Sequence, residues 1–301
     1  MLARHDEADR TAEINRAGVA IARQALGEHG FVLGDIGPFG GLMEPYGEVP
    51  RDAVERAFRE QARALVEAGA DAVIIETQTA FEELEIAIAA AREAGAPAVI
   101  GSIAFDRMAD EDDVRTMMGI SPEQAAEFMA ARGCDVAGLN CGTGVDMAMT
   151  AGIVRRYRAA AGLPVMAQPN AGQPVLEGMR VLYKEMPEQM VAGLPGVLAA
   201  GARIVGGCCG STPNHIRRFR RSSTAGGRRR EGDDRRRGGR GRRIPALGKA
   251  GRVRRGRELR RPAPQADEAD PGRRPQARCQ GAWSTVGTRR ASLRKAMEET
   301  R

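Results

Sequence analysis

The 301 residues carry 46 Lys and Arg against 39 Asp and Glu, but the two signs are separated along the chain. Residues 217–301 hold 28 basic and 9 acidic residues, a net of +19, whereas residues 1–216 hold 18 and 30, a net of −12. The basic overall balance therefore belongs to one segment, and it argues against nucleic acid as the partner of the folded part. The sequence has no 18-residue apolar span and no apolar leader, which excludes a membrane helix and predicts a cytoplasmic protein.

Helical and strand-like segments alternate from residue 7 to residue 220. Apolar residues at helical spacing predict helices at 7–26, 51–68, 82–93, 122–131, 153–161, 189–200 and 213–220. Short apolar runs predict strands at 31–38, 72–76, 98–103, 135–139, 164–167 and 202–205. Glycine and polar clusters follow the strands at their carboxyl ends, where a (β/α)₈ TIM barrel carries its active site. We therefore predict such a barrel, with six strands visible; a Rossmann fold is disfavoured because no Gly-x-Gly-x-x-Gly follows an early strand.

The chain changes character after Phe219. Arginine clusters alternate there with Gly, Pro and Ala and show no sustained apolar period, so the segment cannot bury enough surface to offset its ordering entropy. We predict a barrel domain at 1–221 and a disordered basic tail at 222–301. The tail would be a solvated appendage, a translation-frame artefact or a polyanion-binding arm, in which only Trp283 could stack on a base.

Two adjacent cysteines, Cys208 and Cys209, follow the strand at 202–205 and are surrounded by glycines. Side chains alternate on a strand, so two neighbouring thiols can face one point only where the backbone bends, and glycine permits such a bend. Cys141 ends another strand, so closure of a barrel would bring three thiols to one mouth. Three protein ligands with an open fourth position are typical of catalytic zinc, whereas structural zinc has four. A disulfide between adjacent cysteines is disfavoured by its geometry.

Three other residues of metal-binding type receive different interpretations. Cys134 precedes its strand and has no partner at ligand spacing, so we expect a small buried hydrophobe. His215 follows Pro213 at the start of a helix, and we expect an ordinary surface or capping residue. Cys279 lies in the tail and belongs to no predicted site.

The cysteine motifs resemble those of the homocysteine S-methyltransferases, including the homocysteine-binding barrels of cobalamin-dependent methionine synthases. The resemblance rests on Gly138-Leu139-Asn140-Cys141 and on Gly206-Gly207-Cys208-Cys209-Gly210-Ser211-Thr212-Pro213. Additional matches are Asp35-Ile36-Gly37-Pro38, Glu76-Thr77 and Pro169-Asn170-Ala171-Gly172. The resemblance implies a zinc-dependent methyl transfer to homocysteine that forms methionine. It also implies that Cys141, Cys208 and Cys209 hold the Zn²⁺ and that the homocysteine sulfur is the fourth ligand.

The same resemblance implies substrate-binding roles for two further residues. Glu76 would bind the substrate ammonium, although a strand-end carboxylate could instead cap the next helix. Asn140 would orient a ligand or hydrogen-bond the substrate, although a purely structural role is equally open.

Two departures from the family pattern shape the remaining expectations. The family begins with a strand bearing Asp-Gly-x-x-Gly-Thr and a second strand, and neither precedes the segment at 7–26, so we expect a barrel that lacks its first two strands. The tail has no cobalamin-binding Asp-x-His-x-x-Gly, so the methyl donor would be a separate corrinoid protein, betaine or a methylsulfonium. The alternatives to an active enzyme are a catalytically impaired zinc-binding fragment and a scaffold for a polyanion-binding tail.

Overall fold

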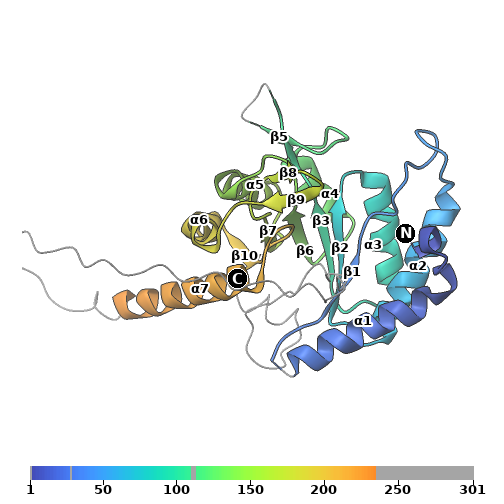
Figure 1. Ribbon diagram of the computed structural model, residues 1–301, viewed down its shortest axis with the longest axis horizontal. Coiled ribbons are helices and arrows are strands. Elements are labelled where there is room, and N and C mark those ends of the chain that lie inside the picture. Colours follow the sequence, from blue (N-terminus) through green and yellow to red (C-terminus); the bar gives the residue numbers. More distant parts are fainter. Residues whose placement is uncertain (1, 28, 110–112, 235–301) are drawn as a thin grey trace, which may run out of the picture. The chain divides into compact units, whose positions relative to one another are not determined.

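A parallel six-stranded sheet is the centre of the fold. The computed structural model describes residues 2–27, 29–109 and 113–234, and Figure 1 shows the strands side by side with helices on the outside. The strand order is β1-β2-β3-β6-β7-β10, and every pairing is parallel. The strands are β1 (Leu33–Ile36), β2 (Ala72–Gln78), β3 (Val99–Ile103), β6 (Val136–Asn140), β7 (Val165–Gln168) and β10 (Ala202–Val205). The six predicted strands and their parallel arrangement are confirmed.

Helices alternate with the strands as predicted, and the largest differences in their starts are at α1 and α5. They are α1 (Thr11–Leu26), α2 (Arg51–Glu67), α3 (Phe81–Glu93), α4 (Pro122–Ala131), α5 (Met147–Ala160), α6 (Pro187–Ala199) and α7 (Pro213–Asp234). Two short 3₁₀ turns, η1 (Leu2–His5) and η2 (Ala8–Arg10), replace the predicted first turn of α1. Helix α5 begins six residues before residue 153 because the Asp146 side chain accepts a hydrogen bond from Met149 N and caps it.

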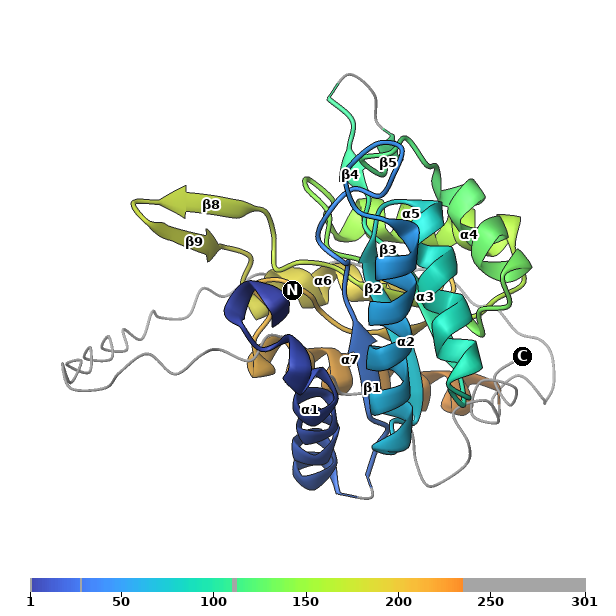
Figure 2. The same ribbon diagram turned by 90° about the vertical axis from the view of Figure 1, so that its right-hand side faces the viewer.

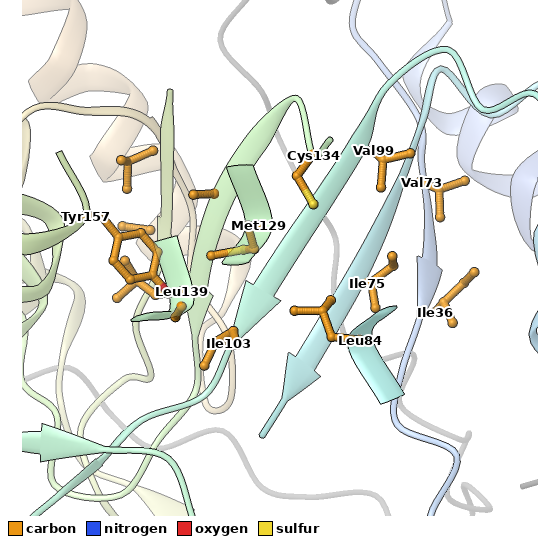
Figure 3. Packing of buried hydrophobic residues seen from close by; sticks show 14 of the residues in the cluster. Ile36, Val73, Ile75, Leu84, Val99, Ile103, Met129, Cys134, Leu139 and Tyr157 are labelled. Carbon is orange, nitrogen blue, oxygen red and sulfur yellow. The ribbon is translucent and has the colours of Figure 1, made fainter. Parts of the chain in front are cut away.

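Side chains on the two faces of the sheet belong to different layers. One face packs under the helices, and Figure 3 shows Ile36, Val73, Ile75 and Val99 there, with Leu84 and Met129 among the residues packed against them. The other face carries a separate small cluster. It consists of Ile74, Ile100, Val136 and Met166, with Leu33 and Ile204 packed against it. Each strand contributes one of these six residues, so the cluster is the apolar floor of the barrel interior.

Two antiparallel hairpins were not predicted. Strands β4 (Asp106–Arg107) and β5 (Val114–Arg115) pair after β3, and β8 (Pro174–Glu177) pairs with β9 (Arg180–Tyr183) after β7. In Figure 2 the second hairpin stands away from the sheet. Both faces of this hairpin are exposed, so it lacks the alternation that identifies a half-buried strand. The sequence feature that could have indicated this hairpin was Gly178, which lies at its turn with φ 60°.

Strands β1 and β10 are the two edges of the six-stranded sheet. Among the described residues, β1 pairs only with β2, and β10 only with β7. Helix α7 continues to Asp234 and so includes the first residues of the predicted tail; the disorder predicted for 222–301 stays a prediction, and residues 235–301 lie outside the described part. Within the described ranges, every helix is too short or too polar to cross a membrane.

Candidate metal centre

Two loops bring three cysteine thiols together at the carboxyl end of the sheet. Cys141 directly follows β6, and Cys208 and Cys209 follow β10. The Cys141 and Cys209 sulfurs lie 3.9 Å apart, the Cys208 and Cys209 sulfurs 4.0 Å apart, and all three Sγ atoms lie within 4.8 Å of one another. The three residues are half-buried. The structure thus brings together the three cysteines that the sequence motifs grouped.

The backbone around the thiols adopts conformations that depend on glycine. Cys141 itself has φ 55°, in the left-handed region that costs a non-glycine residue about 1–3 kcal/mol. Gly142 follows with φ 91°, and a Cβ there would lie 1.9 Å from the Phe105 carbonyl oxygen. At the other loop, a Cβ on Gly210 would lie 2.3 Å from the Tyr183 ring. Both loops therefore pass too close to their neighbours for any other residue at these glycines.

The loop after β7 holds the cysteine pair in place. Cys208 N donates to Pro169 O across 2.9 Å, and Ala171 N donates to Cys209 O across 2.9 Å. Cys209 N donates to Asn170 Oδ1 across 3.0 Å. These bonds fix the bend that lets two adjacent thiols approach Cys141.

Each thiol also has a hydrogen-bond donor of its own. Asn170 Nδ2 donates to Cys141 Sγ and Asn140 Nδ2 to Cys208 Sγ, each across 3.7 Å. The Tyr183 side chain forms a hydrogen bond with Cys209, which helps to lower the pKa of that thiol. Donors placed in this way stabilise sulfur atoms that carry negative charge.

The thiols influence one another's ionisation. Hydrogen bonds from Cys141 and Cys208 lower the pKa of Cys209, whereas the bonds that Cys208 makes with the other two thiols raise its own pKa. One thiolate is therefore favoured, and ionisation of all three is opposed by their mutual repulsion. A divalent cation would remove this repulsion, and three thiolates within 4.8 Å of one another suit a soft or borderline metal such as zinc.

Glu76 lies at the end of β2 among groups that disfavour its charge. Burial, the neighbouring Asp35 carboxyl group, which is hydrogen-bonded to it, and Cys141 together raise its pKa to about 8. The Glu76 Oε1 atom is buried and has no hydrogen-bond partner among the described residues. Its unpaired Oε1 does not cap α3, whose N-cap residue Ala80 makes no side-chain capping bond either, so the structure gives no support to the alternative that Glu76 caps this helix.

Asn140 is 2% exposed and its amide is fully used within the protein. Its Oδ1 accepts hydrogen bonds from Ser102 Oγ at 2.6 Å and Thr77 N at 3.0 Å. Its Nδ2 donates to Thr77 Oγ1 at 2.7 Å in addition to Cys208 Sγ. Thr77 has φ 59°, so Asn140 stabilises the strained end of β2 and connects it to the thiols.

Cys134 and His215 lie outside the thiol cluster. Cys134 is 5% exposed, as expected for a small buried hydrophobe, and burial raises the pKa of its thiol to about 12. His215 is a capping residue but not a surface one: it is 4% exposed, and its Nδ1 accepts from Thr212 N at 3.0 Å. Its Nε2 pairs with Glu185 O, which explains the burial. Cys279 lies outside the described residues.

The sequence interpretation assigned no role to Asn170 or Tyr183. Asn170 follows β7 at the carboxyl end of the sheet, where the sequence predicts the active site. This position could have indicated a role for Asn170 beside the cysteines. Tyr183 lies at the end of β9, in the hairpin that was not predicted, and nothing in the sequence places it beside Cys209.

Comparisons with known proteins place this geometry in a family. The profile of the homocysteine S-methyltransferase family matches residues 2–222. The methionine synthases of Mycobacterium tuberculosis and Mycobacterium leprae are each 33% identical over 220 residues, which cover 71% of this chain and 18% of theirs. The apo form of the Escherichia coli homocysteine methyltransferase MmuM has a similar fold, with a TM-score of 0.55 at 23% identity over 71% of this chain and 75% of that one. The chain belongs to the homocysteine S-methyltransferase family.

Proposed function

We propose that this chain transfers a methyl group to the thiol of homocysteine and forms methionine, with a zinc ion held by Cys141, Cys208 and Cys209. The observation that carries the proposal is the cluster of three thiols at the carboxyl end of a parallel sheet in a chain of this family. In the reaction a bond forms between the substrate sulfur and the methyl carbon. The bond between that carbon and the donor breaks, its electron pair leaves with the donor, and the thiol proton leaves to solvent.

The three thiolates and their hydrogen-bond donors would prepare the substrate sulfur for attack. A free thiol is mostly protonated at neutral pH, and bound zinc supplies the positive charge that converts it to a thiolate. Three protein thiolates around a dication would carry a net charge of −1, which would keep the substrate sulfur electron-rich. Asn170, Asn140 and Tyr183 would each stabilise the charge on one protein sulfur and fix its direction.

Glu76 and Asp35 would bind the substrate ammonium. Burial raises the pKa of both carboxyl groups, and the charges of Asp35 and Cys141 raise the pKa of Glu76 as well. In the part of the chain that the structure describes, no protein cation acts on either group to favour its negative charge. A cationic ligand would supply the missing charge and a donor for Glu76 Oε1. Asn140 has no free donor or acceptor, so we assign it to positioning Cys208 and Thr77 rather than to contacting substrate.

Methionine formation tests this proposal. We expect the zinc-loaded chain to form methionine from homocysteine with at least one of three donors: a methylated corrinoid, betaine or a methylsulfonium. The Cys208→Ser variant, assayed in parallel, should form none above the uncatalysed rate. Binding of zinc and homocysteine without methionine formation from any donor would contradict the proposal and favour a catalytically impaired member of the family.

A further inference from the structure

Gln168, the last residue of β7, has a fully buried side chain whose polar atoms are unused. The residue is 0% exposed, and neither Oε1 nor Nε2 has a hydrogen-bond partner in the described part of the chain. Its backbone oxygen does accept a bond, from Cys141 N at 3.3 Å, so the amide side chain alone is unpaired. An amide buried without partners is costly, and such groups are rare in folded proteins unless a ligand or water pairs with them.

The alternation along β7 directs this side chain into the barrel interior. Met166 belongs to the apolar floor, Ala167 to the layer beneath the helices, and Gln168 again to the inner face. In the sheet Gln168 is opposite Asn140, whose side chain extends instead toward Ser102 and Thr77. On β2, Glu76 follows Ile74 of the same apolar cluster by two residues and so faces the same side of the sheet. Strands β3 and β6 separate β2 from β7. Gln168 and Glu76 therefore face the interior from two strands that β3 and β6 separate, and both strands end near Cys141.

The charge environment differs along the sheet. Strands β1 and β2 carry the Asp35 and Glu76 carboxyl groups, where negative charge is already disfavoured, so an ammonium would be favoured beside them and a carboxylate would not. Within the six strands of the parallel sheet, as described, the only basic residue is Arg203, which is exposed near the amino end of β10. A carboxylate in the interior would consequently bind to neutral donors on the strands away from β1 and β2, and the Gln168 Nε2 group on β7 is a donor without an acceptor.

We propose that Gln168 binds the carboxylate of the amino-acid substrate through Nε2, while Glu76 binds its ammonium. The inference rests on the proposed function, and it adds a second anchor that orients homocysteine across the barrel with its thiol toward the cysteines. An amide that is paired only when substrate is bound would also discriminate against thiols that lack the carboxylate, because such thiols would leave the amide unpaired.

The test measures thiol binding to the zinc-loaded chain by calorimetry, in the wild type and in Gln168→Met. Homocysteine is compared with mercaptobutyrate, which keeps the carboxylate but lacks the ammonium, and with mercaptopropylamine, which keeps the ammonium but lacks the carboxylate. Loss of a hydrogen bond to a charged group should weaken the binding of homocysteine and mercaptobutyrate by about 10- to 100-fold. Mercaptopropylamine binding should change less than about twofold. Met166→Leu, two residues earlier on the same face, is the matched control and should leave the preference among the three thiols unchanged.

Thermal unfolding of the same variants separates a binding role from a structural one. Because Gln168→Met removes an unpaired buried amide, its unfolding midpoint should lie above that of the wild type. A lower midpoint, failure to fold, or equal weakening of all three thiols would overturn the inference and indicate that an internal water or protein group pairs with the amide. If the zinc-loaded wild type binds none of the thiols, the proposed function itself fails, and the inference fails with it.

Discussion

Replacing any one of Cys141, Cys208 and Cys209 by serine should remove the bound zinc. Each residue supplies one of only three protein ligands, and a serine hydroxyl neither ionises near neutral pH nor matches the preference of zinc for thiolate. We expect about one zinc per wild-type chain and less than roughly one tenth of that in each variant. Elemental analysis of purified, desalted protein measures both values directly.

Cys134→Ser is the matched control for these variants. Cys134 is buried under the helices, away from the cluster, and its raised thiol pKa makes it a poor ligand. Its replacement should lower stability slightly, because a hydroxyl enters an apolar site, but should leave zinc content unchanged. Undiminished zinc in Cys141→Ser together with either of the other two variants would show that the metal, if any, binds elsewhere.

Glu76→Gln should weaken homocysteine binding by about 10- to 100-fold while leaving zinc content unchanged. The amide keeps the size of the side chain but loses the charge that attracts the substrate ammonium. The free protein should become more stable, because burial and the adjacent Asp35 both disfavour the Glu76 carboxylate. Calorimetric titration with homocysteine, together with thermal unfolding, measures the two opposite effects in one variant.

Glu85→Gln is the control for the Glu76 variant. Glu85 lies on α3 and forms a half-exposed ion pair with Arg132 at 3.0 Å, so its replacement should change neither zinc content nor substrate affinity. Loss of zinc from Glu76→Gln would show that this carboxylate is a ligand or supports one. Unchanged homocysteine affinity would remove Glu76 from the substrate site.

The sheet could be predicted from the sequence because its strands are buried on both faces. Runs such as 72–76 and 98–103 are almost wholly apolar, and a glycine or a proline separates each of them from the helix that precedes it. The start of α5 was missed because Asp146 is a capping residue without a helical apolar period around it. Exposure on both faces hid the β8–β9 hairpin, and burial of His215 depends on a contact with Glu185 O from a distant loop.

The thiol cluster could be predicted because each cysteine ends a strand, and parallel strands end at one edge of the sheet. The hydrogen bonds around it could not, because they join residues far apart in the sequence. Asn140 and Cys208 are 68 residues apart, and Asn170 and Cys141 are 29 apart. Gln168 was indistinguishable from any strand-end polar residue until the structure showed its amide buried and unpaired.

X-ray absorption at the zinc edge tests most directly the central claim that the substrate thiol binds at the three-cysteine metal site. The zinc-loaded chain without substrate should show three sulfur ligands and one lighter atom, because three protein thiolates leave one position open. Addition of homocysteine should raise the number of sulfur ligands to four, and methionine, whose sulfur is already methylated, should not. A sulfur count that stays at three with saturating homocysteine would contradict the account.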